Sequence, residues 1–139
     1  MEIDLALLAD AATVDAAGKL NILGIFDRIS AQGFPAPHPH LSLVLRFHAG
    51  LNEAGSHKVE IVLRDPDGAE VVRVSGEMQI GPGPLNAGGQ VRVPQVLNLG
   101  RLVFPQPGPY AFDVSVDGEH QTSIPLTLHE AGGGGGIRA

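Results

Sequence analysis

The sequence predicts an all-β protein, an antiparallel two-sheet sandwich of immunoglobulin-like kind with seven to eight strands. Short segments of alternating apolar and polar residues recur along the 139 residues, as in strands that bury one face. Glycine (19) and proline (11) are frequent, as expected of turns that join many short strands. No segment has a helical apolar period over ten or more residues, so we expect no helices.

The segment from Gly18 to Ile29 is predicted to be the central strand. Its apolar residues fall on both alternating sets of positions, whereas a strand with one face in water would have them on one set only. The segment should therefore be covered on both faces, or else change faces at a bulge, for which Gly24 is the obvious site. Residues 3–9 are predicted to be a strand in preference to a helix, because the turn at 14–18 would make the two strands a hairpin.

Residues 30–40 contain three prolines and are predicted to be a stiff loop that crosses between the sheets. The strand expected after it, residues 41–47, alternates strictly, with leucines and Phe47 directed inward. Residues 58–64 repeat the same pattern.

The remaining strands are expected at 72–80, 90–104, 110–116 and 122–128, joined by turns at 65–68 and 117–118. Pro94 should divide its segment into two short strands or mark an edge strand with a bulge. Pro125 should place the last strand at an edge or at a bulge, because proline cannot donate to a β-ladder. Tyr110 follows a Pro-Gly turn, and both a tyrosine corner and a plain core tyrosine fit that position.

We expect one β-sandwich domain over residues 1–128. Residues 129–139 are predicted to be a flexible tail, because the five consecutive glycines at 132–136 would lose much backbone entropy on ordering.

Composition excludes several classes of function. The net charge of -6 and the 4% aromatic content argue against nucleic-acid binding. The absence of cysteine excludes disulfides, thiol nucleophiles and cysteine-ligated metals. No apolar run is long enough to cross a bilayer, and Asp4 and Asp10 interrupt the N-terminal segment where a signal peptide would be apolar. We therefore expect a soluble, cytoplasmic protein.

Three stretches resemble a family of small bacterial proteins classed as a domain of unknown function. They are Ala9-Asp10, the run from Gly18 to Asp27, and the run from Leu97 to Tyr110. The resemblance covers nearly the whole chain except the glycine tail. It implies a single β domain and no particular activity or site residue.

His38 and His40 are the candidates for a metal site. In an extended segment, residues i and i+2 project to the same side, and two imidazoles at that spacing can share one ion. A third ligand would have to come from Glu53, His57 or His120, which the sequence does not bring close. Two solvent-exposed histidines are the favoured interpretation.

Three carboxylates lie around the first hairpin: Asp10, Asp15 and Asp27. Two converging carboxylates could serve as acid and base, but an ion pair or a solvated group is favoured, with Arg46 or Arg64 as the expected partner of Asp27. The sequence holds no Gly-x-Ser-x-Gly, and the prolines at 82 and 84 remove donors that a phosphate loop would need. We therefore expect no catalytic and no cofactor-binding residues.

The leading functional hypothesis is a non-enzymatic binding or assembly module that acts through an unknown protein partner or forms a homo-oligomer by an exposed strand edge. One alternative is a small-ligand or carbohydrate-binding module that uses loops 30–40 and 81–89. The other is a metal-dependent hydrolase that uses His38 and His40.

Overall fold

The computed structural model describes residues 1–81 and 90–131, which form nine strands and one short 3-10 helix. The strands are β1 (Glu2–Val14), β2 (Leu20–Phe26), β3 (Arg28–Ala31), β4 (Ala36–Gly50), β5 (Gly55–Arg64), β6 (Glu70–Ile80), β7 (Gln90–Phe104), β8 (Gly108–Val116) and β9 (Glu119–Glu130), and the 3-10 helix is η1 (Leu51–Glu53). The described part of the chain contains no helix that could span a membrane.

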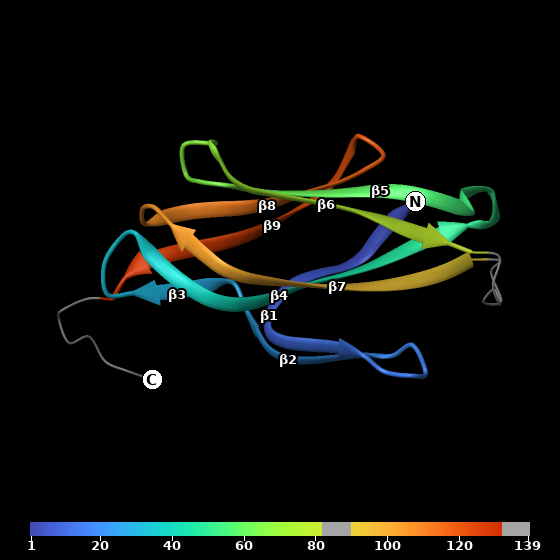
Figure 1. Cartoon of the computed structure of the whole chain (residues 1–139), viewed down its shortest axis with the longest axis horizontal. Coiled ribbons are helices and arrows are strands. Elements are labelled where there is room, and N and C mark those ends of the chain that lie inside the picture. The colour runs from blue at the N-terminus through green and yellow to red at the C-terminus, as the bar shows by residue number, and fades with distance from the viewer. Residues whose placement is uncertain (82–89, 132–139) are drawn as a thin grey trace.

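The strands form two sheets, which we call sheet A and sheet B (Figure 1). Sheet A has the order β2-β1-β4-β7, and sheet B has the order β3-β9-β8-β5-β6. All neighbours are antiparallel except β3 and β9, which are parallel. The predicted all-β, two-sheet sandwich is confirmed, and its immunoglobulin-like kind stays a prediction.

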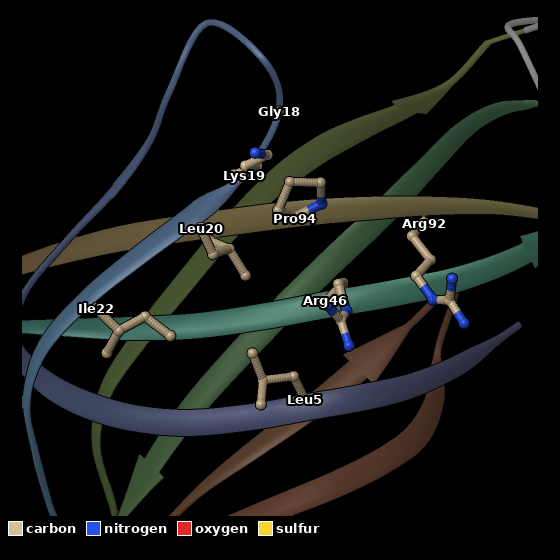
Figure 2. Close-up of a pocket in the computed structure, with 8 residues that line it drawn as sticks. All are labelled: Leu5, Gly18, Lys19, Leu20, Ile22, Arg46, Arg92 and Pro94. Carbon is tan, nitrogen blue, oxygen red and sulfur yellow. The ribbon is translucent and has the colours of Figure 1, made fainter.

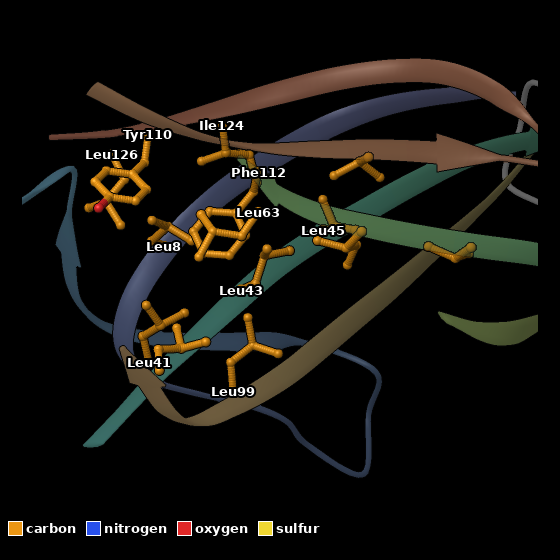
Figure 3. Packing of buried hydrophobic residues seen from close by; sticks show 14 of the residues in the cluster. Leu8, Leu41, Leu43, Leu45, Leu63, Leu99, Tyr110, Phe112, Ile124 and Leu126 are labelled. Carbon is orange, nitrogen blue, oxygen red and sulfur yellow. The ribbon is translucent and has the colours of Figure 1, made fainter. Parts of the chain in front are cut away.

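The core lies between the two sheets and is built from alternate residues of their inner faces (Figure 3). In β4 the residues that point inward are those that the alternation of 41–47 predicts, and they meet residues of β5, β8 and β9 from sheet B. The largest fully buried side chains are Phe47, Phe104, Phe112, Leu8, Leu41, Leu43, Leu45, Ile61, Leu63, Ile80, Leu126 and Leu128.

The predicted central strand at 18–29 is wrong. The segment forms two edge strands instead: β2 pairs only with β1 in sheet A, and β3 pairs only with β9 in sheet B. The chain changes sheets at Asp27, whose carbonyl accepts a hydrogen bond from the Thr127 amide. Apolar residues occupy both sets of positions because the segment contacts different surfaces before and after this change, and because Leu23 and Ile25 stay exposed. Because this segment forms two strands in place of one, the described part of the chain has nine strands, more than the seven to eight predicted.

The β1–β2 hairpin lies against the outer face of sheet A. β1 pairs with β4 through Glu2–Ala9 and with β2 through Leu8–Val14, so its second half leaves β4 at Ser42 and turns back under the sheet (Figure 1). Val44 points away from the core and is nevertheless fully buried. A third, partial layer therefore covers part of sheet A.

The expected loop at 30–40 does cross from one sheet to the other, from β3 to β4, but it is shorter than predicted. β4 begins at Ala36, so Pro37 and Pro39 lie within a strand. The strand tolerates them because N–H groups two residues apart point to the same side, and β1 pairs with β4 only from Ser42 onward.

Two further prolines, Pro94 and Pro125, also lie within strands. Pro94 lies in an edge strand, as expected, but β7 continues past it without a shift of register. Pro125 marks neither an edge strand nor a bulge. β9 is internal, and its register with β8 is regular at Pro125, but β3 pairs with β9 only from Thr127 onward. β9 extends two residues into the predicted tail, and residues 132–139 lie outside the described residues.

Candidate functional site

The β1–β2 hairpin is the candidate functional site, and a tight turn fixes its end. The Asp15 carboxylate accepts hydrogen bonds from the amides of Ala17 at 2.9 Å and Lys19 at 3.0 Å. These amides lower the pKa of Asp15, with the Lys19 amide as the largest cause. The turn predicted at 14–18 is therefore confirmed, and it orients the two faces of the hairpin.

The outward side of β2 carries an exposed apolar patch of Leu23 and Ile25, which we call the edge patch. These side chains are 72% and 66% exposed, and they stand on a strand that has a partner on one side only. A shallow groove of about 290 Å³ continues from Ile25 toward sheet B, and its walls include Leu8, Ile124 and Pro125. Apolar surface and an open strand edge thus occur at the same place.

The other face of the hairpin encloses a groove of about 480 Å³ against sheet A, which we call the hairpin groove (Figure 2). Its lining consists of Leu5, Gly18, Lys19, Leu20, Ile22, Arg46, Arg92 and Pro94. Four of these side chains are apolar, and three are cationic. The sequence analysis missed this grouping, because it depends on β1 folding the hairpin back onto β4 and β7.

Asp4 joins two of the cations at the rim of the hairpin groove. One of its carboxylate oxygens lies 2.8 Å from Arg46 Nε, and the other lies 3.3 Å from Arg92 Nε. The hydrogen bond from Arg46 is the largest cause that lowers the pKa of Asp4, so the carboxylate stays ionised. Both bonds come from Nε, so Asp4 accepts no hydrogen bond from the terminal nitrogens of either guanidinium.

The structure gives His38 and His40 different surroundings. The His38 ring packs near the rings of Phe26 and Phe104, with centroids 6.1 and 6.5 Å apart. His40 is exposed, and its Nε2 lies 3.5 Å from the Ser42 hydroxyl. Within residues 1–81 and 90–131, no group of three histidine, aspartate or glutamate residues could hold a metal ion.

The residues considered as a third metal ligand lie elsewhere. His57 is held by the Asp117 carboxylate at 2.6 Å from Nδ1 and by the Glu53 carbonyl at 2.6 Å from Nε2. Glu53 follows the far end of β4, whereas His38 lies close to the beginning of that strand. His120 lies on the β8–β9 hairpin beside Ser123. None of the three therefore accompanies the pair at 38 and 40.

The three hairpin carboxylates do not converge. Asp15 belongs to the turn, Asp10 lies beside Gly24, and Asp27 is exposed at the change of sheets. The expected partners of Asp27 are engaged elsewhere, because Arg46 pairs with Asp4, and Arg64 pairs with Asp113 at 3.0 Å. Arg46 and Arg64 are therefore wrong as partners of Asp27, and of the two favoured interpretations its exposure fits the solvated group.

Sequence analysis also missed a serine, histidine and aspartate that meet on the surface of sheet B. Ser123 donates to the Asp113 carboxylate at 2.7 Å, and His120 Nε2 lies 2.9 Å from the Ser123 hydroxyl oxygen. Ser123 stands opposite Asp113 in the ladder, so the turn at 117–118 was the signal that could have found the trio. The serine proton is directed at the carboxylate and not at the imidazole, and the His120 side chain is 58% exposed. The arrangement therefore lacks the activated, water-excluded serine of a hydrolase.

The two loops proposed as one ligand site have flanks at opposite ends of the sandwich. Ala36, after the first loop, pairs with Phe104, whereas Gly50 at the other end of β4 pairs with Gln90, which follows the second loop. A strand of this length spans roughly 45 Å. Residues 82–89 themselves lie outside the described residues.

A family model described as "Family of unknown function (DUF6941)" matches residues 4–129 of the chain. No curated protein matches the sequence. Among solved structures, the chain is similar to the Pseudomonas fluorescens alkylpurine DNA glycosylase AlkC bound to DNA containing an abasic site analog, with 13% sequence identity and a TM-score of 0.49. The match covers 92% of this chain and 30% of the glycosylase chain, so this chain spans less than a third of that structure.

Proposed function

The chain belongs to DUF6941, a family of unknown function, and we propose that it is a non-enzymatic assembly module that binds a second copy of itself through β2. The observation that carries this proposal is the edge patch, in which Leu23 and Ile25 stand exposed on an open strand. Open edges offer unpaired backbone N–H and C=O groups, and exposed apolar side chains beside them favour pairing with another strand.

Comparison with the other edges supports the choice of β2. Edge strands of monomeric proteins are commonly protected by charges or proline. Of the four edge strands in the described part of the chain, β3, β6 and β7 each carry charged residues, and β7 also carries Pro94. β2 has the sequence LNILGIF, with neither a charge nor a proline. It is thus the edge with the least protection against association.

β2 is also complementary to itself. If two copies pair antiparallel around Gly24, Leu23 lies opposite the partner's Ile25, and Asn21 lies opposite the partner's Asp27. Apolar side chains then face apolar side chains, and an amide donor faces a carboxylate. A two-fold interface of this kind joins the two copies of sheet A into one continuous sheet. A cytoplasmic location is part of the same proposal, and the absence of cysteine is compatible with it.

The test is the mass of the protein in solution, measured by size-exclusion chromatography with light scattering over about a hundredfold range of concentration. We expect a dimer that Ile25→Lys converts to a monomer, because a lysine on the edge opposes strand pairing. Val103→Lys is the matched control, since Val103 is 50% exposed on the edge strand β7, and it should leave the dimer intact.

A strict monomer at the highest concentration would contradict the proposal. So would a dimer that Val103→Lys disrupts and Ile25→Lys does not, because the interface would then lie on β7. If the protein is a strict monomer, the edge patch could still bind a different protein. In that case Ile25→Lys should abolish binding to a partner protein from the source cell.

A further inference from the structure

We infer that the hairpin groove binds an organic anion that carries an apolar body. This site lies on the opposite face of the hairpin from the edge patch, because Leu20 and Ile22 alternate with Leu23 and Ile25 along the hairpin strand. The inference is therefore independent of the proposed self-association. The groove volume of about 480 Å³ lies within the usual range for small-molecule sites.

The charge of the groove argues for an anion. Its lining contains Lys19, Arg46 and Arg92 and no carboxylate, on a chain whose net charge is -6. The adjoining carboxylates are already engaged, Asp4 with both arginines and Asp15 with backbone amides of the turn. Because Asp4 contacts only the Nε atoms, it holds the two guanidiniums in place and leaves their terminal N–H groups for another acceptor.

The remaining lining argues for an apolar body. Leu5, Leu20, Ile22 and Pro94 are each half-buried, so they present apolar surface that a ligand could remove from water. In Figure 2, Leu20 and Ile22 extend from the hairpin toward sheet A, while Arg46 and Arg92 extend from β4 and β7 at one end. Lys19 lies beside Leu20, so the cations flank the apolar lining from two directions (Figure 2). Apolar and cationic groups side by side suit a carboxylate with a hydrocarbon chain better than a bare inorganic anion.

Octanoate is the probe, with acetate and 1-octanol as controls for the charge and the hydrocarbon taken alone. Calorimetry measures affinity, and methyl NMR of Leu5, Leu20 and Ile22 reports the location. We expect octanoate to shift these methyl signals and to bind at least about tenfold more tightly than either control, because 1-octanol lacks the charge-assisted hydrogen bonds and acetate lacks the hydrocarbon that the groove would bury. Higher ionic strength should weaken binding.

Two exposed positions supply the variants. Lys19→Gln and Arg92→Gln should each weaken octanoate binding about tenfold. Arg73→Gln is the matched control, since Arg73 is an exposed arginine of sheet B that pairs with Glu60 and Glu70, and it should leave affinity unchanged. Failure of octanoate to bind at millimolar concentration, equal binding of 1-octanol, or methyl shifts confined to the edge patch would each overturn the inference.

Discussion

The Tyr110 hydroxyl donates to the Gln106 carbonyl at 2.6 Å and accepts from the Gln106 amide at 3.1 Å. One buried side chain thus satisfies both backbone groups of a residue in the turn between β7 and β8, which lie in different sheets. The Tyr110 ring also meets Phe104 edge-on, with centroids 5.2 Å apart. Of the two interpretations that the sequence allowed, the tyrosine corner is confirmed.

Tyr110→Phe should lower the free energy of unfolding by about 1–3 kcal/mol, because it leaves two partly buried backbone groups without their partner. Urea denaturation measures this difference. Gln106→Ala is the control and should change stability by less than about 0.5 kcal/mol, since Tyr110 bonds only to the backbone of residue 106 and the hydrogen bond from the Gln106 side chain to Asp67 is exposed. Equal stability of Tyr110→Phe and the wild type would show that the corner contributes nothing.

The contact between His57 and Asp117 predicts a dependence of stability on pH. Both ring nitrogens of His57 face acceptors, and the hydrogen bond that the Asp117 carboxylate accepts from the ring is the largest cause that raises the pKa of His57. A group whose pKa is raised by folding stabilises the protein below its unfolded pKa, and this contribution is lost as pH rises through the folded value. Stability should therefore fall as pH rises through the raised pKa of His57.

The contribution of Asp117 to stability depends on pH in the opposite direction. Its hydrogen bond with His57 lowers the pKa of Asp117, so its contribution is lost only as pH falls through that lowered value. Denaturation midpoints measured across the pH range should show both limbs. Asp117→Asn keeps a residue type that tolerates the φ of 52° at this turn, and it should flatten the limb at higher pH. If the wild type and Asp117→Asn show the same dependence of stability on pH, the contact between His57 and Asp117 is not the cause of that dependence.

A substitution at Val44, which is buried on the outer face of sheet A, tests whether the hairpin covers that face. Val44→Ala should cost about 1.5–3 kcal/mol, because two methyl groups are removed from a fully buried site beneath the hairpin. Val103→Ala, at a half-exposed position of the edge strand β7, should cost less than about 0.5 kcal/mol. Equal effects in urea denaturation would mean that the hairpin does not cover Val44 in solution.

Local patterns predicted the strands and most turns. The strict alternation of 41–47 predicted which residues of β4 point inward, and Asp65 closes the predicted turn by accepting from the amides of Asp67 and Ala69. Such features depend on residues near one another in the chain, which is why the sequence reveals them.

The position of the segment at 18–29 depended on contacts that local patterns do not specify. Apolar residues on both sets of positions fit a strand covered on both faces, but they fit equally an edge strand that changes sheets and leaves part of its apolar surface exposed. The hairpin groove was hidden for the same reason. Its cations come from residues 19, 46 and 92, which meet only because β1 folds the hairpin under β4 and β7.

Gly24 allows the close approach of the two strands within the hairpin. It has a φ of 74° and stands opposite Asp10, and a Cβ at this position would lie 2.9 Å from Asp10 Cγ and overlap the carboxylate. Gly24→Ala therefore combines the cost of a left-handed backbone, about 1–2 kcal/mol, with a steric clash. Gly18 has a φ of 80° with no heavy atom near its Cβ position, so Gly18→Ala should show the backbone cost alone.

A double-mutant cycle separates the two effects. Asp10→Ala removes the carboxylate that a methyl group at position 24 would meet, so it should recover the steric part of the loss caused by Gly24→Ala, and it should add nothing to Gly18→Ala. Urea denaturation of the single and double variants gives the coupling energies directly. If Asp10→Ala fails to rescue Gly24→Ala, the Asp10 carboxylate is not held against position 24 in solution. The cycle also reports on the edge patch, because Gly24 lies between Leu23 and Ile25, and a hairpin displaced at this point could not present them together.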